Sequence, residues 1–149
     1  MNQKTIHNFI WAPIYLIGVF SLVFGFIWIL HPEPWLLDQP ANEALLQTSF
    51  NELFSDDVNK FLPSYLIVVY RFFGLWLITI GLLVLSYVKV TKLGTKQARL
   101  SIHSTLFLTL ISMYYLILKY LPTSPLIPTL YIFTLFLGLS IYFSSRIEL

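Results

Sequence analysis

Arg71 is the only charged residue within the four long apolar stretches of this chain, and it lies in the run from Tyr70 to Trp76. An ionised side chain at hydrocarbon depth costs at least about 2.5 kcal/mol, so such a residue usually faces the protein interior and has a partner there. A guanidinium group presents a planar set of donors that matches a carboxylate or a phosphate. The sequence therefore indicates Arg71 as the centre of a candidate site, paired with an acid or with a bound headgroup.

No Asp or Glu occurs inside the apolar stretches, so a partner for Arg71 has to come from elsewhere. Three alternatives stay open. In the first, Arg71 has a structural role, in which it reaches toward the surface or pairs with Glu33 or Asp38. In the second, it contacts an anionic lipid or an acidic amphiphile. In the third, it contacts a partner subunit. The candidate ligand or ion-pair residues are Arg71, Glu33, Asp38, Tyr70, Gly74, Gly81, Tyr115 and Lys119.

Residues suited to catalysis or to metal binding are sparse. The chain has no cysteine, and its histidines (His7, His31 and His103) are far apart, with no carboxylate one helical turn away inside a stretch. Glycine-rich phosphate loops and nucleophile motifs are missing as well. We therefore predict no catalytic, metal or cofactor-binding site, and hence no enzyme. Proton-coupled transport is also disfavoured, because intramembrane carboxylates usually carry the proton.

The composition indicates which elements position these residues. Hydrophobic residues make up 57% of the 149-residue chain and charged residues 11%, against about 25% charged in soluble domains. A transmembrane helix needs about 20 apolar residues, and four stretches approach or exceed this length: 9–30, 65–88, 100–118 and 126–143. We predict an all-α integral membrane protein, with one four-transmembrane-helix bundle that uses residues 1–149 as a single domain.

The distribution of charge predicts the orientation of the bundle. If the stretches alternate, six basic residues fall on one side: Lys4, Lys89, Lys92, Lys96, Arg99 and Arg146. Six of the seven carboxylates lie in the loop 31–62 on the opposite side. The positive-inside rule then places both termini in the cytoplasm. This basic side favours contact with membrane lipid rather than with nucleic acid.

The long first extracytoplasmic loop has a helical pattern of its own. Apolar residues recur at helical spacing between positions 42 and 60, with acids and amides on the other face. Ser49 and Glu52 have the spacing of a capping box. We expect one amphipathic helix at about 42–60, acting either as a lid over the bundle or as a surface connector.

Small and hydroxyl residues indicate the packing faces. Gly18, Ser21 and Gly25 share one face of the first stretch, and Gly74 and Gly81 share one face of the second, where they allow close helix contact. Arg71 precedes Gly74 by three residues and is therefore expected to face inward. The hydroxyls of the third stretch are expected to bond one another or backbone carbonyls of their own helix, and so to serve mainly in helix packing.

The layout of four spans with a long first outer loop, together with Arg71-x-x-Gly74 and the later Gly81, resembles the DoxX-like group of small bacterial membrane proteins. The resemblance implies a bacterial inner-membrane location. It also implies an accessory role in a larger membrane complex, without a redox centre of its own.

Two functional hypotheses follow. The first is a non-catalytic accessory or assembly subunit that packs on partner membrane subunits or on copies of itself. The alternative is a binder or carrier of an anionic lipid or quinone-like amphiphile, with Arg71 at the headgroup. A binder should have a cavity lined by Arg71 beneath the 42–60 helix, whereas a subunit should show tight packing.

Overall fold

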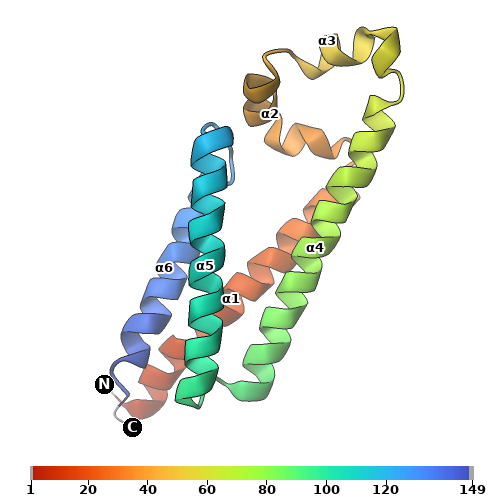
Figure 1. The fold of residues 1–149 in the computed structure, drawn as a ribbon. Helices are drawn as coiled ribbons and strands as arrows, with labels where there is room; N and C mark the ends of the chain where they lie inside the picture. The colour runs from red at the N-terminus through yellow and green to blue at the C-terminus, as the bar shows by residue number, and fades with distance from the viewer. Residues whose placement is uncertain (1, 148–149) are drawn as a thin grey trace.

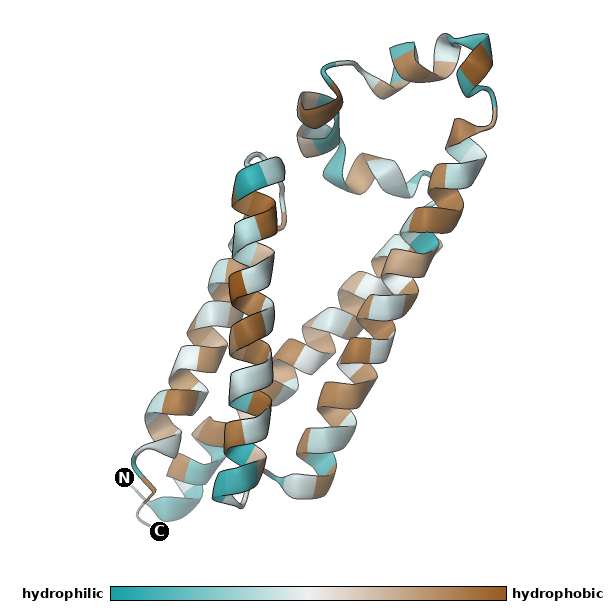
Figure 2. Cartoon of the chain, viewed as in Figure 1, coloured by the Kyte–Doolittle hydropathy of each residue, from teal (hydrophilic) through white to brown (hydrophobic). Residues whose placement is uncertain are grey.

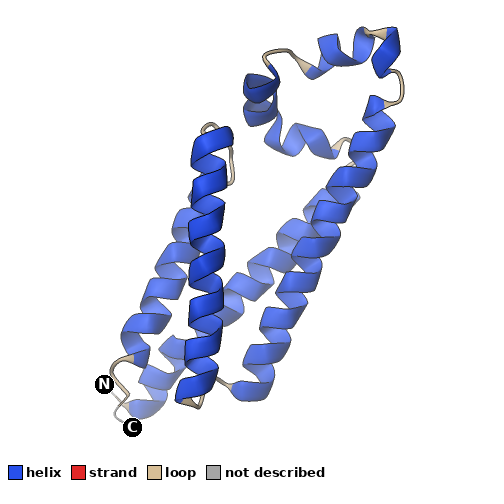
Figure 3. Cartoon of the chain, viewed as in Figure 1, coloured by secondary structure: helices blue, strands red, loops and turns tan. Residues whose placement is uncertain are grey.

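A computed structural model describes residues 2–147, which form helices and connecting loops (Figures 1 and 3). Four helices are long and apolar enough to span a membrane: α1 (Gln3–Leu30), α4 (Leu62–Thr91), α5 (Lys96–Tyr120) and α6 (Ile127–Ser144). Hydrophobic residues run along these helices and hydrophilic residues gather near their ends (Figure 2). The four predicted apolar helices are confirmed, and the first three extend beyond their apolar stretches.

Local signals account for the helix ends. Asn2 caps the start of α1 by accepting a hydrogen bond from the Lys4 backbone N–H, and Thr95 caps α5 in the same way through Ala98. Helices α4 and α6 each begin with a proline in the first turn, where no intrahelical donor is lost. Helix α4 ends at Thr91, and its C-cap residue Lys92 adopts a left-handed conformation with φ of 48°.

The long helices form an open arrangement. Helix α1 lies between α4 and α6, and α5 packs against α6 (Figure 1). Helices α4 and α5 are joined by the short loop 92–95 and diverge away from it (Figure 1). We call the end with this loop and both chain termini the terminal end, and the opposite end the cap end. The fully buried residues Ile10, Ile14, Val88 and Leu93 lie toward the terminal end.

Helices α1 and α4 approach closely at two pairs of glycines. A Cβ atom added to Gly25 would lie 2.7 Å from the Gly74 carbonyl oxygen, and one added to Gly81 would lie 2.8 Å from the Gly18 carbonyl oxygen. Real Cβ contacts are essentially never this short, so only glycine fits at these positions. The small-residue faces predicted for the first two stretches therefore do pack against each other.

The prediction of one amphipathic helix at 42–60 is wrong. The segment 31–61, which we call the cap, contains four short helices: η1 (Pro34–Asp38), α2 (Gln39–Leu46), α3 (Phe50–Ser55) and η2 (Asp57–Asn59). Gln47 takes a left-handed conformation that ends α2. The Ser49 and Asp56 side chains then bond nearby backbone N–H groups and start new helices. Such short polar side chains compete with a continuous helix for backbone donors.

The cap has a small apolar centre and a polar clasp. The Trp35 ring lies 5.5 Å from the Phe54 ring and 6.4 Å from the Phe50 ring. One oxygen of Glu43 accepts hydrogen bonds from the Gln39 side chain and from the Phe50 backbone N–H, both at 2.9 Å. These two bonds lower the pKa of the Glu43 carboxyl. The bond from Phe50 also links α2 to the first turn of α3.

Candidate binding cavity between α4 and α5

The divergence of α4 and α5 leaves a cavity of about 450 Å³ at the cap end. Helices α4 and α5 form its walls, and η1 and α2 contribute residues at its polar end. Its polar side chains are Asp38, Asn42 and Tyr70. The apolar wall includes Leu66, Val69, Phe73, Met113, Leu116 and Ile117. Ligand sites typically combine a volume of about 300–1,000 Å³ with a mostly apolar lining and a few convergent polar groups.

Two hydrogen bonds fix the polar end of the cavity. The Asn42 amide nitrogen donates to the Tyr70 hydroxyl at 2.9 Å and so joins α2 to α4. The Ser124 hydroxyl donates to an Asp38 carboxylate oxygen at 3.0 Å and joins η1 to the loop between α5 and α6. Because Tyr70 accepts the bond from Asn42, its own hydroxyl hydrogen remains available to another acceptor.

Asp38 is only 5% exposed. Burial raises the pKa of its carboxyl, and the hydrogen bond from Ser124 offsets part of that rise. The Asp38 carboxyl therefore binds its proton more tightly in the folded protein than in the unfolded chain. The resulting stabilisation is complete below the ordinary pKa of 3.8 and is lost as the pH rises through the higher folded-state value. A protonated carboxyl can also donate a hydrogen bond to a ligand.

Aromatic packing sets the position of Tyr70. The Trp28 ring of α1 stacks on the Tyr70 ring at 5.2 Å with an interplanar angle of 11°, and it meets Phe73 edge to face at the same distance. Trp28 is itself buried. The phenol ring of Tyr70 is thus held between α1 and the cavity, with its hydroxyl at the polar end.

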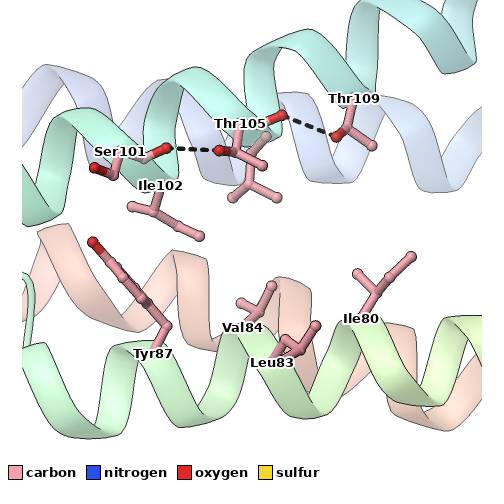
Figure 4. A pocket seen from close by; sticks show the side chains of 9 residues that line it. Ile80, Leu83, Val84, Tyr87, Ser101, Ile102, Thr105 and Thr109 are labelled. Carbon is pink, nitrogen blue, oxygen red and sulfur yellow. Dashed lines mark hydrogen bonds between the residues drawn. The ribbon is translucent and has the colours of Figure 1, made fainter.

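A second cavity of about 410 Å³ lies between the same two helices toward the terminal end (Figure 4). Thr105 and Thr109 line it, but their hydroxyls bond to carbonyls of α5 four residues earlier (Figure 4). The Tyr87 hydroxyl donates to the Ala98 carbonyl at 3.0 Å and links α4 to α5. The hydroxyl hydrogens of Thr105, Thr109 and Tyr87 are used in these bonds, and most of the residues that line the second cavity are apolar.

The first cavity follows α4 from Leu66 to Phe73, and the second follows it from Ile80 to Tyr87. Both present mainly apolar side chains of α4 and α5, which suit the apolar tail of an amphiphile.

The inward orientation predicted for Arg71 is wrong: its side chain is exposed. The inward face of α4 runs through Tyr70, Gly74, Gly81 and Val88. The residue on this face before Gly74 is therefore Tyr70, four positions earlier, and not Arg71, three positions earlier. With 3.6 residues per turn, Arg71 points about 100° away from Tyr70. Arg71 does not line the cavity, and no ion pair or hydrogen bond of its side chain is found within residues 2–147.

The other predicted site residues are scattered. Gly74 and Gly81 form the contact with α1. Lys119 donates to the Tyr115 hydroxyl at 2.9 Å on an exposed face of α5. Glu33 is exposed, and its backbone N–H donates to the His31 ring. Of the predicted candidates, only Asp38 and Tyr70 come together in the cavity.

Sequence reasoning missed Asn42, Trp28 and Ser124 as members of this site. Asn42 and Tyr70 are 28 positions apart, and Asp38 and Ser124 are 86 apart. No periodic pattern connects residues at these separations. Asn42 does follow Asp38 by four residues, which is the spacing of one helical turn, but the predicted helix began only at position 42.

Comparison with known proteins places no further constraint on this site, because no protein-family model, curated protein or solved structure matches the chain. Within the part of the chain that the structure describes, no three His, Asp or Glu side chains could together hold a metal ion. The chemistry available in the cavity is hydrogen bonding at one end and apolar contact along the rest.

Proposed function

We propose that the protein is a membrane-spanning binder of a neutral, quinone-like amphiphile, whose head lies at the cap end and whose tail lies between α4 and α5. The observation that carries this proposal is the 450 Å³ cavity, with Asp38, Asn42 and Tyr70 at one end and apolar walls along the rest. In the proposed orientation the terminal end is cytoplasmic, because Lys4, Lys89, Lys92, Lys96 and Arg146 lie there.

The charges of the cavity favour a neutral head over an anionic one. Arg71 does not line the cavity, and among residues 2–147 Asp38 is the only ionisable carboxyl that does. Burial already makes the ionised form of the Asp38 carboxyl unfavourable, which is why its pKa is raised. A negatively charged headgroup beside it would add a second buried negative charge. A quinone carbonyl instead suits the available donors, which are the Tyr70 hydroxyl and the second N–H of the Asn42 amide.

The accessory-subunit hypothesis and the DoxX-like resemblance remain predictions. Outward aromatic side chains such as Phe72 and Trp76 are exposed, as a subunit interface requires. The same exposure is expected of any helix that faces lipid. The open seam between α4 and α5 favours the binder, since a chain-like ligand fits its shape and its polar end.

The test is mass spectrometry of small molecules extracted from the purified protein. Tyr70→Phe removes one hydroxyl from the cavity, and Tyr131→Phe is the matched control because Tyr131 is exposed on α6. We expect a near-stoichiometric neutral amphiphile with the wild type and the control. Tyr70→Phe should retain about tenfold less, as expected for the loss of one buried hydrogen bond of about 1.4 kcal/mol.

Arg71→Gln separates this proposal from a headgroup site at Arg71. The retained amphiphile should be unchanged in Arg71→Gln, because this side chain lies outside the cavity. A loss of the amphiphile in Arg71→Gln with full retention in Tyr70→Phe would refute the assignment of the head to Asp38, Asn42 and Tyr70.

A further inference from the structure

A basic cavity of about 360 Å³ lies at the terminal end, between the start of α5 and the end of α6. The polar residues that line it are Lys96, Arg99 and His103 from α5, together with Ser144 and Ser145. No acidic residue of the 2–147 segment is among its lining residues. It lies at the opposite end of the molecule from Asp38 and Tyr70, and it is not involved in the function proposed above.

The Arg99 guanidinium is held in place by the loop before it. Its Nη1 atom donates to the carbonyls of Leu93 and Gly94 at 3.2 and 3.1 Å. Lys92 and Leu93 both take left-handed conformations, with φ of 48° and 51°, which shape this loop. Two consecutive residues of these types in that region persist only where the surrounding structure holds them.

Arg99 is 4% exposed, yet it keeps donors for a ligand. Only Nη1 takes part in a hydrogen bond, and no fully buried side-chain nitrogen in the described chain lacks a partner. The Nε and Nη2 donors of Arg99 are therefore not fully enclosed, and Arg99 is among the residues that line this cavity. A positioned guanidinium with free donors is suited to bind a phosphate group.

His103 is fixed in a similar way. The Ser140 hydroxyl donates to the Ile10 carbonyl at 2.6 Å, and its oxygen lies 2.8 Å from His103 Nε2. Because the hydroxyl hydrogen is already used, Nε2 must be the donor in the second bond. In the neutral ring Nδ1 is then an acceptor, so His103, which is 9% exposed and lines the cavity, serves to join α5 to α6 and α1 through Ser140.

The start of α5 adds to the positive potential of the cavity. The first turn of a helix has unpaired N–H groups and the positive end of the helix dipole. Lys96 is the first residue of α5, and its exposed side chain also lines the cavity. Two cationic side chains, Lys96 and Arg99, and a helix start thus converge on one cavity.

We infer that this cavity binds a phosphate group, with the Arg99 guanidinium as the main contact and the Lys96 ammonium beside it. The same chemistry would accept a phosphate carried by an anionic lipid headgroup or a free phosphate.

The experiment is a native mass spectrometry titration of the full-length, detergent-solubilised protein with dioleoylphosphatidylglycerol, repeated in the presence of millimolar inorganic phosphate. Lys96→Gln and Arg99→Gln each remove one positive charge from the cavity. Lys89→Gln is the matched control, because Lys89 is exposed at the same end but does not line the cavity. Arg99→Gln also removes the bonds to Leu93 and Gly94, so Lys96→Gln decides the outcome if the Arg99 variant fails to fold.

We expect the first lipid to bind about tenfold more weakly to Lys96→Gln, the effect of losing one charge-assisted contact, and within about twofold of wild type to Lys89→Gln. Displacement of the lipid by inorganic phosphate would identify a site that also takes free phosphate, and persistence of the lipid would identify a headgroup site. Equal weakening by Lys89→Gln and Lys96→Gln would overturn the inference, because it would indicate only general attraction to a basic surface. Binding by wild type that is no tighter than by Lys96→Gln would overturn it as well.

Discussion

Gly25→Ala tests the closest contact of the fold. The added Cβ would lie 2.7 Å from the Gly74 carbonyl oxygen and 2.8 Å from the Ile78 backbone nitrogen. Ordinary contact begins at 3.4 Å, so α1 and α4 would have to separate by about 0.7 Å at this point. A gap of 0.5–1 Å already removes a quarter to a half of the dispersion energy of the contacts it affects. Forced overpacking of this kind costs about 1–3 kcal/mol.

Gly138→Ala is the matched control, because an added Cβ there meets no atom within 4 Å. Both substitutions replace glycine by alanine inside a helix, a change that favours the helix by about 1 kcal/mol. The difference between the two variants therefore isolates the steric cost, and we expect Gly25→Ala to be less stable than Gly138→Ala by about 2 kcal/mol. The assay is unfolding in mixed micelles of increasing SDS fraction, followed by tryptophan fluorescence, to which the buried Trp28 and Trp35 contribute. Equal stability of the two variants would refute the close α1–α4 contact.

Three further predictions concern single side chains. The wild type should lose stability as the pH rises from about 4 toward neutrality, because the folded protein favours the protonated Asp38 carboxyl, and Asp38→Asn should remove this loss. Thermal unfolding from pH 3 to 8 measures the effect. The same pH dependence of stability in the variant and the wild type would contradict it. Ser140→Ala should cost about 1–3 kcal/mol, since it leaves His103 Nε2 and the Ile10 carbonyl without their buried partner. The exposed Ser112→Ala should cost under about 0.5 kcal/mol in the same unfolding assay. Arg71→Leu should leave the unfolding midpoint unchanged within about 0.5 kcal/mol, and a large loss would show that Arg71 has a partner after all.

The four long helices could be predicted because their signal is local. A run of about 20 apolar residues is sufficient to indicate each helix, and no knowledge of neighbours is required. The helices extend past these runs where polar caps are present, as at Asn2 and Thr95. The glycine contact was also predictable, because Gly18 and Gly25 lie seven residues apart, as do Gly74 and Gly81.

The orientation of Arg71 could not be settled by spacing from one glycine. Positions three and four residues before Gly74 both lie near its face, and they differ by about 100°. The full buried face, which continues through Gly81 and Val88, shows that Tyr70 and not Arg71 belongs to it. Arg71 lies 18 residues from Lys89, or about 27 Å along the helix. In a membrane this separation would place both charged groups near opposite headgroup layers.

The cavity itself depends on tertiary structure. It exists because α1 separates α4 from α6 and α5 packs on α6, which leaves α4 and α5 apart at the cap end. Its polar end joins residues from η1, α2 and α4, and the cap helices are broken by local side-chain caps that a hydrophobic pattern does not reveal. Neither feature can be inferred from the periodicity of a single segment.

Photo-crosslinking from within the cavity tests the central claim most directly. A benzoylphenylalanine at position 116 would lie on the α5 wall of the cavity, and one at position 135 would lie outside it on α6. Leu116 and Leu135 are similarly exposed, at 53% and 60%. We predict a single small-molecule adduct of a neutral amphiphile at position 116 and none of that mass at position 135. The same mixture of lipid adducts at both positions, or an adduct with another protein at position 116, would contradict the proposed binding function.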